Sequence, residues 1–279
     1  MALDQDTLES EVKDKEMSFF DHLDALRKHL IRMALAVVVF SIVGFAYIDY
    51  IFHNIILGPL NKDFFTYQKL CEFSQKFYHN DQFCINDLHY TLQNTEMAGQ
   101  FMMSFKLSFL VGIVLSMPVM LWQVWLFIKP ALSVKERKRT RGFVFYTSVL
   151  FGLGILFGYF VLCPISVNFF AHYSLSSLIK NEINMQNVIS FMTLLVLGTG
   201  LIFELPVLMY FLAKLGLISS AFLIKYRKYA FVVILIIAAI VTPPDIVSQI
   251  ILTIPLYSLF EMGVFVIKRV EKQKVSDNE

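Results

Sequence analysis

Residues 191–213, FMTLLVLGTGLIFELPVLMYFLA, decide the fold class of this chain. Glu204 is the only acidic or basic side chain in this stretch, which is long enough to cross the apolar core of a bilayer as a helix. Because a carboxyl at bilayer depth is costly, its presence indicates a membrane protein with a functional polar site. No nucleophile, metal-ligand cluster or nucleotide-binding loop accompanies Glu204, so we expect the site to recognise or conduct rather than to catalyse.

The composition supports a polytopic membrane protein. Hydrophobic residues make up 57% of the chain and charged residues only 16%, compared with about 25% charged residues in soluble domains. The net charge is +2, and no basic patch interleaved with aromatic residues lies outside the flanks of the apolar segments, which argues against nucleic-acid binding. The six histidines lack metal-ligand spacing, and no hydrolase or nucleotide-binding motif is present. We therefore expect no enzyme activity, no metal and no cofactor.

The pattern of apolar segments predicts an all-α protein with six transmembrane helices, at about 31–50, 105–128, 142–163, 189–213, 229–242 and 246–267. Residues 17–267 then form a single membrane domain, with a large periplasmic loop over 60–100. Residues 1–16 carry six acids and lack the features of a signal peptide, so they predict a disordered cytoplasmic tail. Residues 268–279 form a second cytoplasmic tail.

Basic residues predict the orientation. Of the 24 Lys and Arg residues, 19 lie in the N-terminal part, in the 129–141 and 214–228 loops or after residue 267. Because retained basic loops mark the cytoplasmic side, both termini are expected to be cytoplasmic.

The fifth segment is unusually short. Residues 229–241 precede Pro243 and cover about 20 Å as a helix, compared with a bilayer core near 30 Å. Three explanations stay open: the membrane thins locally, the helix lies beside a polar cavity, or its ends extend through Lys225 and Asp245.

The loop over 60–100 contains Cys71 and Cys84 in a compartment expected to be oxidising. A disulfide between them is the favoured interpretation, and two reduced thiols are the alternative. Cys163, at the end of the third segment, is interpreted as a packing residue.

Two cytoplasmic segments carry candidate site residues. SFFDHLDALRKHL, residues 18–30, predicts an amphipathic helix that lies at the membrane interface and leads into the first span, which a simple anchor would also explain. The loop KPALSVKERKRTR, residues 129–141, has Glu136 as its only acid among six cations. Local pairing with Arg137 or Arg139 is favoured by the sequence alone, while a cationic ligand is the alternative.

Two further polar sites lie within or beside the apolar segments. Pro206 cannot donate to the carbonyl of Ile202, which leaves a polar notch beside Glu204; the alternative is a protonated Glu204 hydrogen-bonded to a neighbouring helix. TPPDIVSQ, residues 242–249, predicts a tight turn in which Thr242, Asp245 and Gln249 serve either the hairpin itself or the helix of a partner.

Four separated motifs resemble the TatC family of twin-arginine translocase proteins, in register from about residue 18 to 267. They are HLDALRKHL at 22–30, SMPVMLWQVWLFIKPALSVKERK at 116–138, FELPV at 203–207 and TPPDIVSQIILTIPLYSLFEMGVF at 242–265. The resemblance implies a six-helix, glove-like receptor of the bacterial inner membrane that binds twin-arginine signal peptides of folded proteins. It also implies assembly in an oligomeric complex with small single-span subunits of the TatA and TatB type, and transport driven by the proton-motive force.

The resemblance also implies roles for individual residues. The signal-binding surface maps onto Leu26, Arg27 and Glu136, and the in-membrane glutamate maps onto Glu204, whose role is either signal insertion or partner docking. The partner-binding cluster maps onto Thr242 and Gln249. The remaining matches, interpreted as kinks and turns, are Pro59, Pro118, Pro206 and Asp245.

One position departs from the family pattern: Ala25 stands where the family usually has a glutamate. Asp24 is a weak substitute, because it points about 100° away from position 25 on an ideal helix. Without the motifs, the rival interpretation is a secondary transporter with Glu204 as its proton or cation site.

Overall fold

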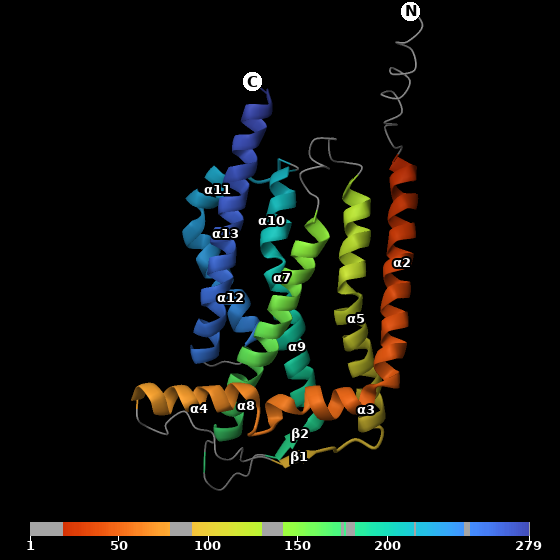
Figure 1. The fold of residues 1–279 in the computed structure, drawn as a ribbon, viewed down its shortest axis with the longest axis vertical. Helices are drawn as coiled ribbons and strands as arrows, with labels where there is room; N and C mark the ends of the chain where they lie inside the picture. The colour runs from red at the N-terminus through yellow and green to blue at the C-terminus, as the bar shows by residue number, and fades with distance from the viewer. Residues whose placement is uncertain are drawn as a thin grey trace, which may run out of the picture.

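The structure is a computed structural model that describes residues 19–78, 91–129, 142–173, 176, 182–214, 216–242 and 246–278. The described chain is mostly helical, as predicted. Its main helices stand side by side (Figure 1): α2 (Phe19–Ala46), α5 (Gly99–Ile128), α7 (Phe143–Phe157) continuing into α8 (Cys163–His172), α9 (Met185–Phe203) continuing into α10 (Leu205–Lys214), α12 (Arg227–Val241) and α13 (Ile246–Asn278).

Shorter elements connect these helices. They are α3 (Ile48–Ile51), the π-helical turns η1 (Phe52–Ile56) and η4 (Gly158–Leu162), the 3-10 turn η2 (Gly58–Leu60), α4 (Phe65–Tyr78), α11 (Ser220–Lys225), and the strands β1 (Thr91–Gln93) and β2 (Glu182–Asn184). We call the end of the bundle where α2 begins and α10 and α13 end the terminal end. The opposite end, which carries α3, α4, β1 and β2, is the capped end (Figure 1).

Within the described residues, five helices are long and apolar enough to cross a membrane: Leu23–Ala46, Gly99–Ile128, Phe143–His172, Met185–Lys214 and Ser248–Arg269. The sixth predicted span corresponds to α12, which has only 15 residues and extends about 22 Å. The predicted shortness of this segment is therefore present in the structure, while six crossings stay a prediction.

Two of the long helices are interrupted where proline removes a backbone donor. The π-helical turn η4 directly precedes Cys163 and Pro164, and a turn at Glu204 separates α9 from α10, whose second residue is Pro206. Proline clashes with the preceding turn of a helix and bends it. Cys163 is fully buried and free, in keeping with a packing residue.

Glycines allow α7 and α9 to approach closely. A Cβ added to Gly154 would lie 2.8 Å from the Cα of Gly200 and 2.8 Å from the backbone oxygen of Thr199. The Thr199 hydroxyl donates to the carbonyl of Gly154 at 3.0 Å. Small residues and a hydroxyl bond across the contact are the usual means of packing helices in a membrane.

The capped end closes the bundle. Helix α4 lies across the long helices (Figure 1), so the predicted 60–100 loop contains a helix of its own. The buried Tyr67 hydroxyl lies 3.0 Å from the carbonyl oxygen of Pro59 and 2.9 Å from that of Pro164, and this holds α4 against η2 and α8. Strands β1 and β2 pair in parallel, with Leu92 opposite Ile183. Cys71 is disulfide-bonded, while its predicted partner Cys84 lies outside the described residues.

The N-terminal amphipathic segment and the first predicted span form one uninterrupted helix, α2, of 28 residues. The segment therefore leads into the span as predicted, while its place at a membrane interface stays a prediction. Its predicted apolar stripe, which includes Leu23, Leu26 and Leu30, is exposed and continues along the exposed apolar side of α2. No proline or glycine separates the two parts, so nothing in the sequence breaks the helix between them. The predicted tail over 1–16 lies outside the described residues.

Candidate functional site

Glu204 lies in the turn that joins α9 to α10. Its backbone oxygen accepts from the amides of Val207 and Leu208, each at 3.0 Å, so the backbone of the turn starts α10. Both carboxyl oxygens of Glu204 are buried, and neither has a hydrogen-bond partner among the described residues. A buried polar group without a partner costs about 1–3 kcal/mol. Such a group in a membrane helix indicates a site kept for a ligand or partner.

The protein holds this turn firmly from two sides. Before the turn, Gly200 contacts α7 at the close crossing described above. After it, Gly263 of α13 packs against α10: a Cβ added there would lie 2.8 Å from the sulfur of Met209 and 3.6 Å from the Cα of Pro206. The Glu204 turn is thus placed between helices that cannot readily shift, so the carboxyl has a defined position.

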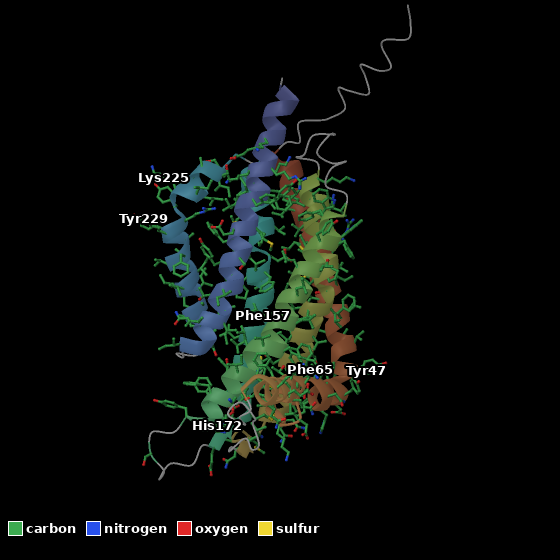
Figure 2. The ribbon with its side chains drawn as sticks, turned by 60° about the vertical axis from the view of Figure 1, so that its left-hand side comes forward. Tyr47, Phe65, Phe157, His172, Lys225 and Tyr229 are labelled. Carbon is green, nitrogen blue, oxygen red and sulfur yellow. The ribbon has the colours of Figure 1, made fainter. Side chains whose placement is uncertain are left out.

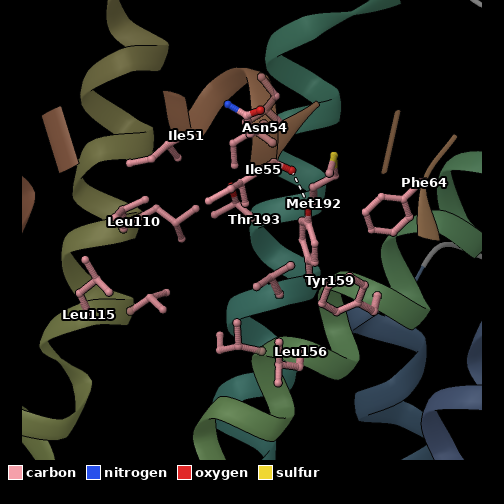
Figure 3. A pocket seen from close by; sticks show the side chains of 17 residues that line it. Ile51, Asn54, Ile55, Phe64, Leu110, Leu115, Leu156, Tyr159, Met192 and Thr193 are labelled. Carbon is pink, nitrogen blue, oxygen red and sulfur yellow. Dashed lines mark hydrogen bonds between the residues drawn. The ribbon is translucent and has the colours of Figure 1, made fainter. Parts of the chain in front are cut away.

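A cavity of about 590 Å³ occupies the half of the bundle nearer the capped end (Figure 3). Its walls come from α3, η1, α5, α7, η4 and α9 and are almost entirely apolar, as at Leu110, Leu156 and Met192. Tyr159 lines it as well, but its hydroxyl donates to the carbonyl of Ile55 at 2.6 Å and so is already paired. The lining of α9 ends at Val196, eight residues or about 12 Å along the axis before Glu204.

The predicted signal-contact residues of α2 lie at the terminal end. Leu26 and Arg27 are both exposed. One turn away, His29 Nδ1 and Gln123 Oε1 are 2.7 Å apart, and the His29 ring packs edge-on against Phe127, which joins α2 to the last turns of α5. Because α5 leads directly into the predicted 129–141 loop, this pairing brings Leu26 and Arg27 close to where that loop starts.

The structure describes only some of the acidic residues that were predicted to act near this surface. Asp24, the weak substitute for the missing family glutamate, is exposed and pairs with Lys28 at 3.4 Å. An exposed pair of this kind contributes little stability and can be exchanged for another cation. Glu136 and Asp245 lie outside the described residues, so their roles stay predictions. Pro118 lies inside α5.

Thr242 and Gln249 both lie in the α12–α13 hairpin, and each donates to a backbone carbonyl of α12. The Thr242 side chain is only 5% exposed, and its hydroxyl donates to the carbonyl of Ala238 at 2.8 Å. The Gln249 amide donates across the hairpin to the carbonyl of Leu235 at 3.2 Å. These bonds stabilise the hairpin itself; a role in partner contact stays a prediction.

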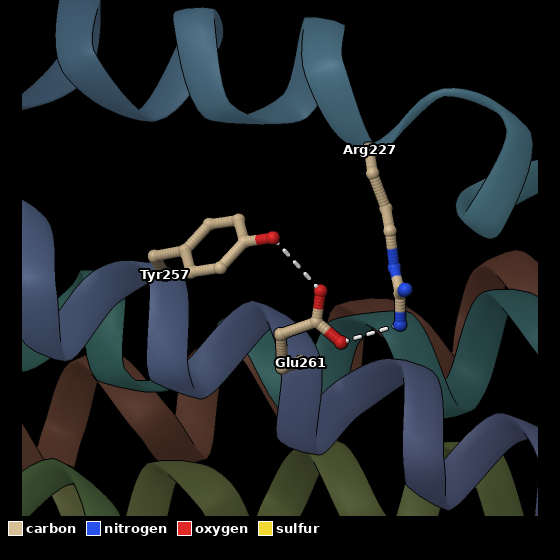
Figure 4. A network of polar contacts seen from close by, with 3 residues as sticks. All are labelled: Arg227, Tyr257 and Glu261. Carbon is tan, nitrogen blue, oxygen red and sulfur yellow. Dashed lines mark hydrogen bonds and ion pairs between the residues drawn. The ribbon is translucent and has the colours of Figure 1, made fainter.

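A polar network at the terminal end was not predicted from the sequence (Figure 4). Arg227, at the start of α12, donates to Glu261 of α13 at 2.6 Å, and the Tyr257 hydroxyl donates to the other carboxylate oxygen at 3.0 Å. The only signal in the sequence was that Glu261 is the sole charged residue within the apolar segment 246–267. Its partner is 34 residues away, and no periodic pattern points to it.

The geometry combines a terminal-end surface on α2 and α5, an in-membrane carboxyl and an apolar cavity on the same bundle. A profile of the family described as Sec-independent protein translocase protein (TatC) matches residues 21–255. The chain belongs to the TatC family. This membership confirms the resemblance drawn from the four motifs and makes the chain a component of a protein translocase, from a family of transport proteins rather than enzymes.

TatC relatives match this chain over nearly its whole length. The TatC protein of Blattabacterium sp. subsp. Periplaneta americana is 39% identical over 262 residues, which are 93% of this chain and 98% of that protein. The TatC protein of Escherichia coli K12 is 34% identical over 244 residues, 88% of this chain and 85% of its own length. We therefore describe this chain as a multi-pass membrane protein.

Solved TatC structures share the fold. A crystal structure of the twin-arginine translocase receptor TatC in DDM superposes with a TM-score of 0.68 at 30% identity, covering 88% of this chain and 99% of that one. A second crystal structure of the receptor gives a TM-score of 0.64 at 29% identity. The residues matched by the family profile, 21–255, include the elements that carry Glu204 and the α2–α5 surface.

Proposed function

We propose that this protein is the signal-peptide receptor of a twin-arginine translocase. The observation that carries the proposal is the structural likeness to the twin-arginine translocase receptor over 88% of the chain, together with the unpartnered Glu204 carboxyl at its centre. In this proposal six helices cross the membrane in a glove-like arrangement with both termini cytoplasmic. The chain recognises twin-arginine signals and nucleates assembly with small single-span subunits, and the proton-motive force drives export of the folded cargo.

The α2–α5 surface and the loop over 129–141 bind the arginines of the signal. Leu26 and Arg27 lie exposed on α2, and the His29–Gln123 contact holds α2 against the helix that leads into the loop. Glu136 supplies the carboxylate, because a carboxylate can accept two parallel hydrogen bonds from a guanidinium. The same geometry cannot be made with the single ammonium of lysine, so this surface distinguishes twin-arginine from twin-lysine peptides.

The in-membrane features serve the apolar part of the signal or a partner helix. A signal peptide carries an apolar stretch of about 7–15 residues after its basic start. The apolar cavity between α5 and α9 offers a complementary surface, and Glu204 provides a polar contact further along α9. Thr242 and Gln249, in the α12–α13 hairpin, are proposed to contact the single-span subunits.

Photocrosslinking tests this function directly. A photoreactive amino acid at position 136, with a second variant labelled at Leu26, is offered twin-arginine or twin-lysine signal peptides in membranes. We expect adducts with the twin-arginine peptide at both positions and few with the twin-lysine peptide. Two results would contradict this: adducts of equal yield with both peptides, or no adducts at either position in an inserted and folded protein. Either result would favour the rival interpretation, a secondary transporter with Glu204 as its proton or cation site.

A further inference from the structure

The corner formed by α11, the start of α12 and the last turns of α13 carries a strong positive charge. Five exposed cations lie there and form no ion pair with any other described residue: Lys225, Lys228, Lys268, Arg269 and Lys272. We call these residues, with the exposed aromatic side chains Phe222, Tyr226 and Tyr229, the basic corner. Figure 2 shows Lys225 and Tyr229 projecting outward from the bundle near the terminal end.

The described acids that could balance this charge are used inside the protein. Glu261 accepts from Arg227 and Tyr257. Glu271 accepts from the backbone amide of Ser220 at 2.8 Å and from the Ser220 hydroxyl. These bonds fasten α11 and α12 to α13, so they give the corner a fixed shape. Among the residues whose side chains the structure describes, the outward face of the corner then carries positive charge only.

The aromatic side chains place this charge at the level of lipid headgroups. Tyr229 is 68% exposed on a helix that belongs to the membrane domain, and Phe222 and Tyr226 are exposed beside it. Tyrosine rings with one apolar and one polar edge concentrate at the boundary between the acyl chains and the headgroups. Lysine side chains near a helix end extend toward the same level, where phosphate groups lie.

We propose that the basic corner binds the headgroups of anionic phospholipids. A group of cations beside interfacial aromatic residues fits a lipid phosphate, since each Lys or Arg near an anionic surface adds about fivefold to the affinity. The corner would repel the arginines of a signal peptide, and its helices α11, α12 and α13 stand on the opposite side of the bundle from α2 and α5 (Figure 1). The inference goes beyond the receptor function and requires only that the chain is embedded in a membrane.

Lipid-selective fluorescence quenching tests the proposal with the full chain in nanodiscs. A genetically encoded fluorescent amino acid replaces Tyr229 in one protein and Ile240 in another; Ile240 is similarly exposed, at 71%, but lies near the other end of α12. The discs contain phosphatidylcholine with spin-labelled phosphatidylglycerol or spin-labelled phosphatidylcholine as the quencher. We expect the label at 229 to prefer phosphatidylglycerol by about fivefold or more, and the label at 240 to show no preference.

Charge variants separate the corner from general attraction to a basic protein. The double variant Lys225→Gln, Lys228→Gln removes two of the five exposed cations of the corner and should clearly lower the preference at position 229. The control Lys62→Gln, Lys76→Gln removes two exposed cations at the capped end and should leave it unchanged. Equal quenching by both lipids at 229, or the same loss in both double variants, would overturn the proposal. These outcomes do not depend on signal-peptide binding, so they also leave the receptor function to be judged separately.

Discussion

The close crossing of α7 and α9 makes a sharp prediction for Gly154→Ala. The added methyl group would lie 2.8 Å from the Gly200 Cα, 2.8 Å from the Thr199 backbone oxygen and 2.9 Å from the Phe203 Cβ. The first two contacts are with backbone, which cannot rotate away, so the helices must separate. Inserting a methyl group into a filled core typically costs about 1–3 kcal/mol. The Thr199 hydroxyl bond to the Gly154 carbonyl would weaken as well.

A matched control lies two residues away in the same helix. An added Cβ at Gly152 would meet no atom within 4 Å. Alanine has a higher helix propensity than glycine by about 1 kcal/mol, and this gain applies at both positions. The difference between the two variants therefore isolates the steric term, for which we take about 2 kcal/mol from the middle of the range.

Thermal unfolding of the purified variants in detergent, followed by tryptophan fluorescence, measures this difference. At about 2–4 °C per kcal/mol for a domain of this size class, Gly154→Ala should unfold roughly 4–8 °C below Gly152→Ala. Gly152→Ala should match or exceed the parent protein. A midpoint for Gly154→Ala equal to that of its control would refute the close helix crossing on which the position of Glu204 depends.

Three other predictions follow from the polar groups. Glu204→Leu should raise the unfolding midpoint, because it removes a buried carboxyl that has no hydrogen-bond partner among the described residues and so costs about 1–3 kcal/mol of stability. The same variant should lower export of a folded twin-arginine cargo, and unchanged export would mean that the carboxyl has no role. Glu204→Gln should give no such stabilisation. Glu261→Gln should lower the midpoint by less than Gly154→Ala does, because Arg227 and Glu261 are both partly exposed. In a double-mutant cycle, Arg227→Gln should add little to the loss of stability caused by Glu261→Gln, and fully additive losses would show that the two side chains are not coupled. Glu136→Lys should weaken binding of a twin-arginine peptide far more than that of a twin-lysine peptide in an equilibrium titration, and equal losses would count against guanidinium recognition.

Most of the fold that could be predicted from the sequence was predicted from its apolar runs and prolines. The long apolar segments around Glu204 and Cys163 predicted membrane helices, because twenty or so apolar residues have few alternatives to a bilayer. The shortness of α12 was visible from the position of Pro243, and the break at Glu204 lies beside Pro206. These features depend on local sequence, which is why they could be inferred without a structure.

Features that depend on distant contacts were harder to predict. Helix α4 has a polar composition and so carries no membrane signal, and it is fixed by Tyr67 contacts with residues such as Pro164 that lie far away in sequence. The amphipathic segment over 18–30 was predicted to lead into the first span, but only the structure shows that the two are a single helix, because hydrophobic patterning distinguishes faces of a helix but not whether one helix ends and another begins.

The same distinction between local sequence signals and distant contacts applies to the candidate site residues. Glu204 stood out because a single carboxyl in an apolar run is rare. The Arg227–Glu261–Tyr257 network was not predicted, since its members are joined only when α12 folds back on α13. Thr242 and Gln249 were recognised as a polar pair, but only the structure revealed that their donors bond to carbonyls of α12.

The central claim is that this chain alone recognises a twin-arginine signal, and the affinity of the purified protein for signal peptides tests it most directly. The chain is placed in nanodiscs without other translocase components, and a fluorescent signal peptide is titrated by anisotropy. We predict saturable binding of the twin-arginine peptide and at least about tenfold weaker binding of the twin-lysine peptide, a discrimination of about 1.4 kcal/mol. Equal affinity for the two peptides, or no binding by a folded protein, would contradict the claim.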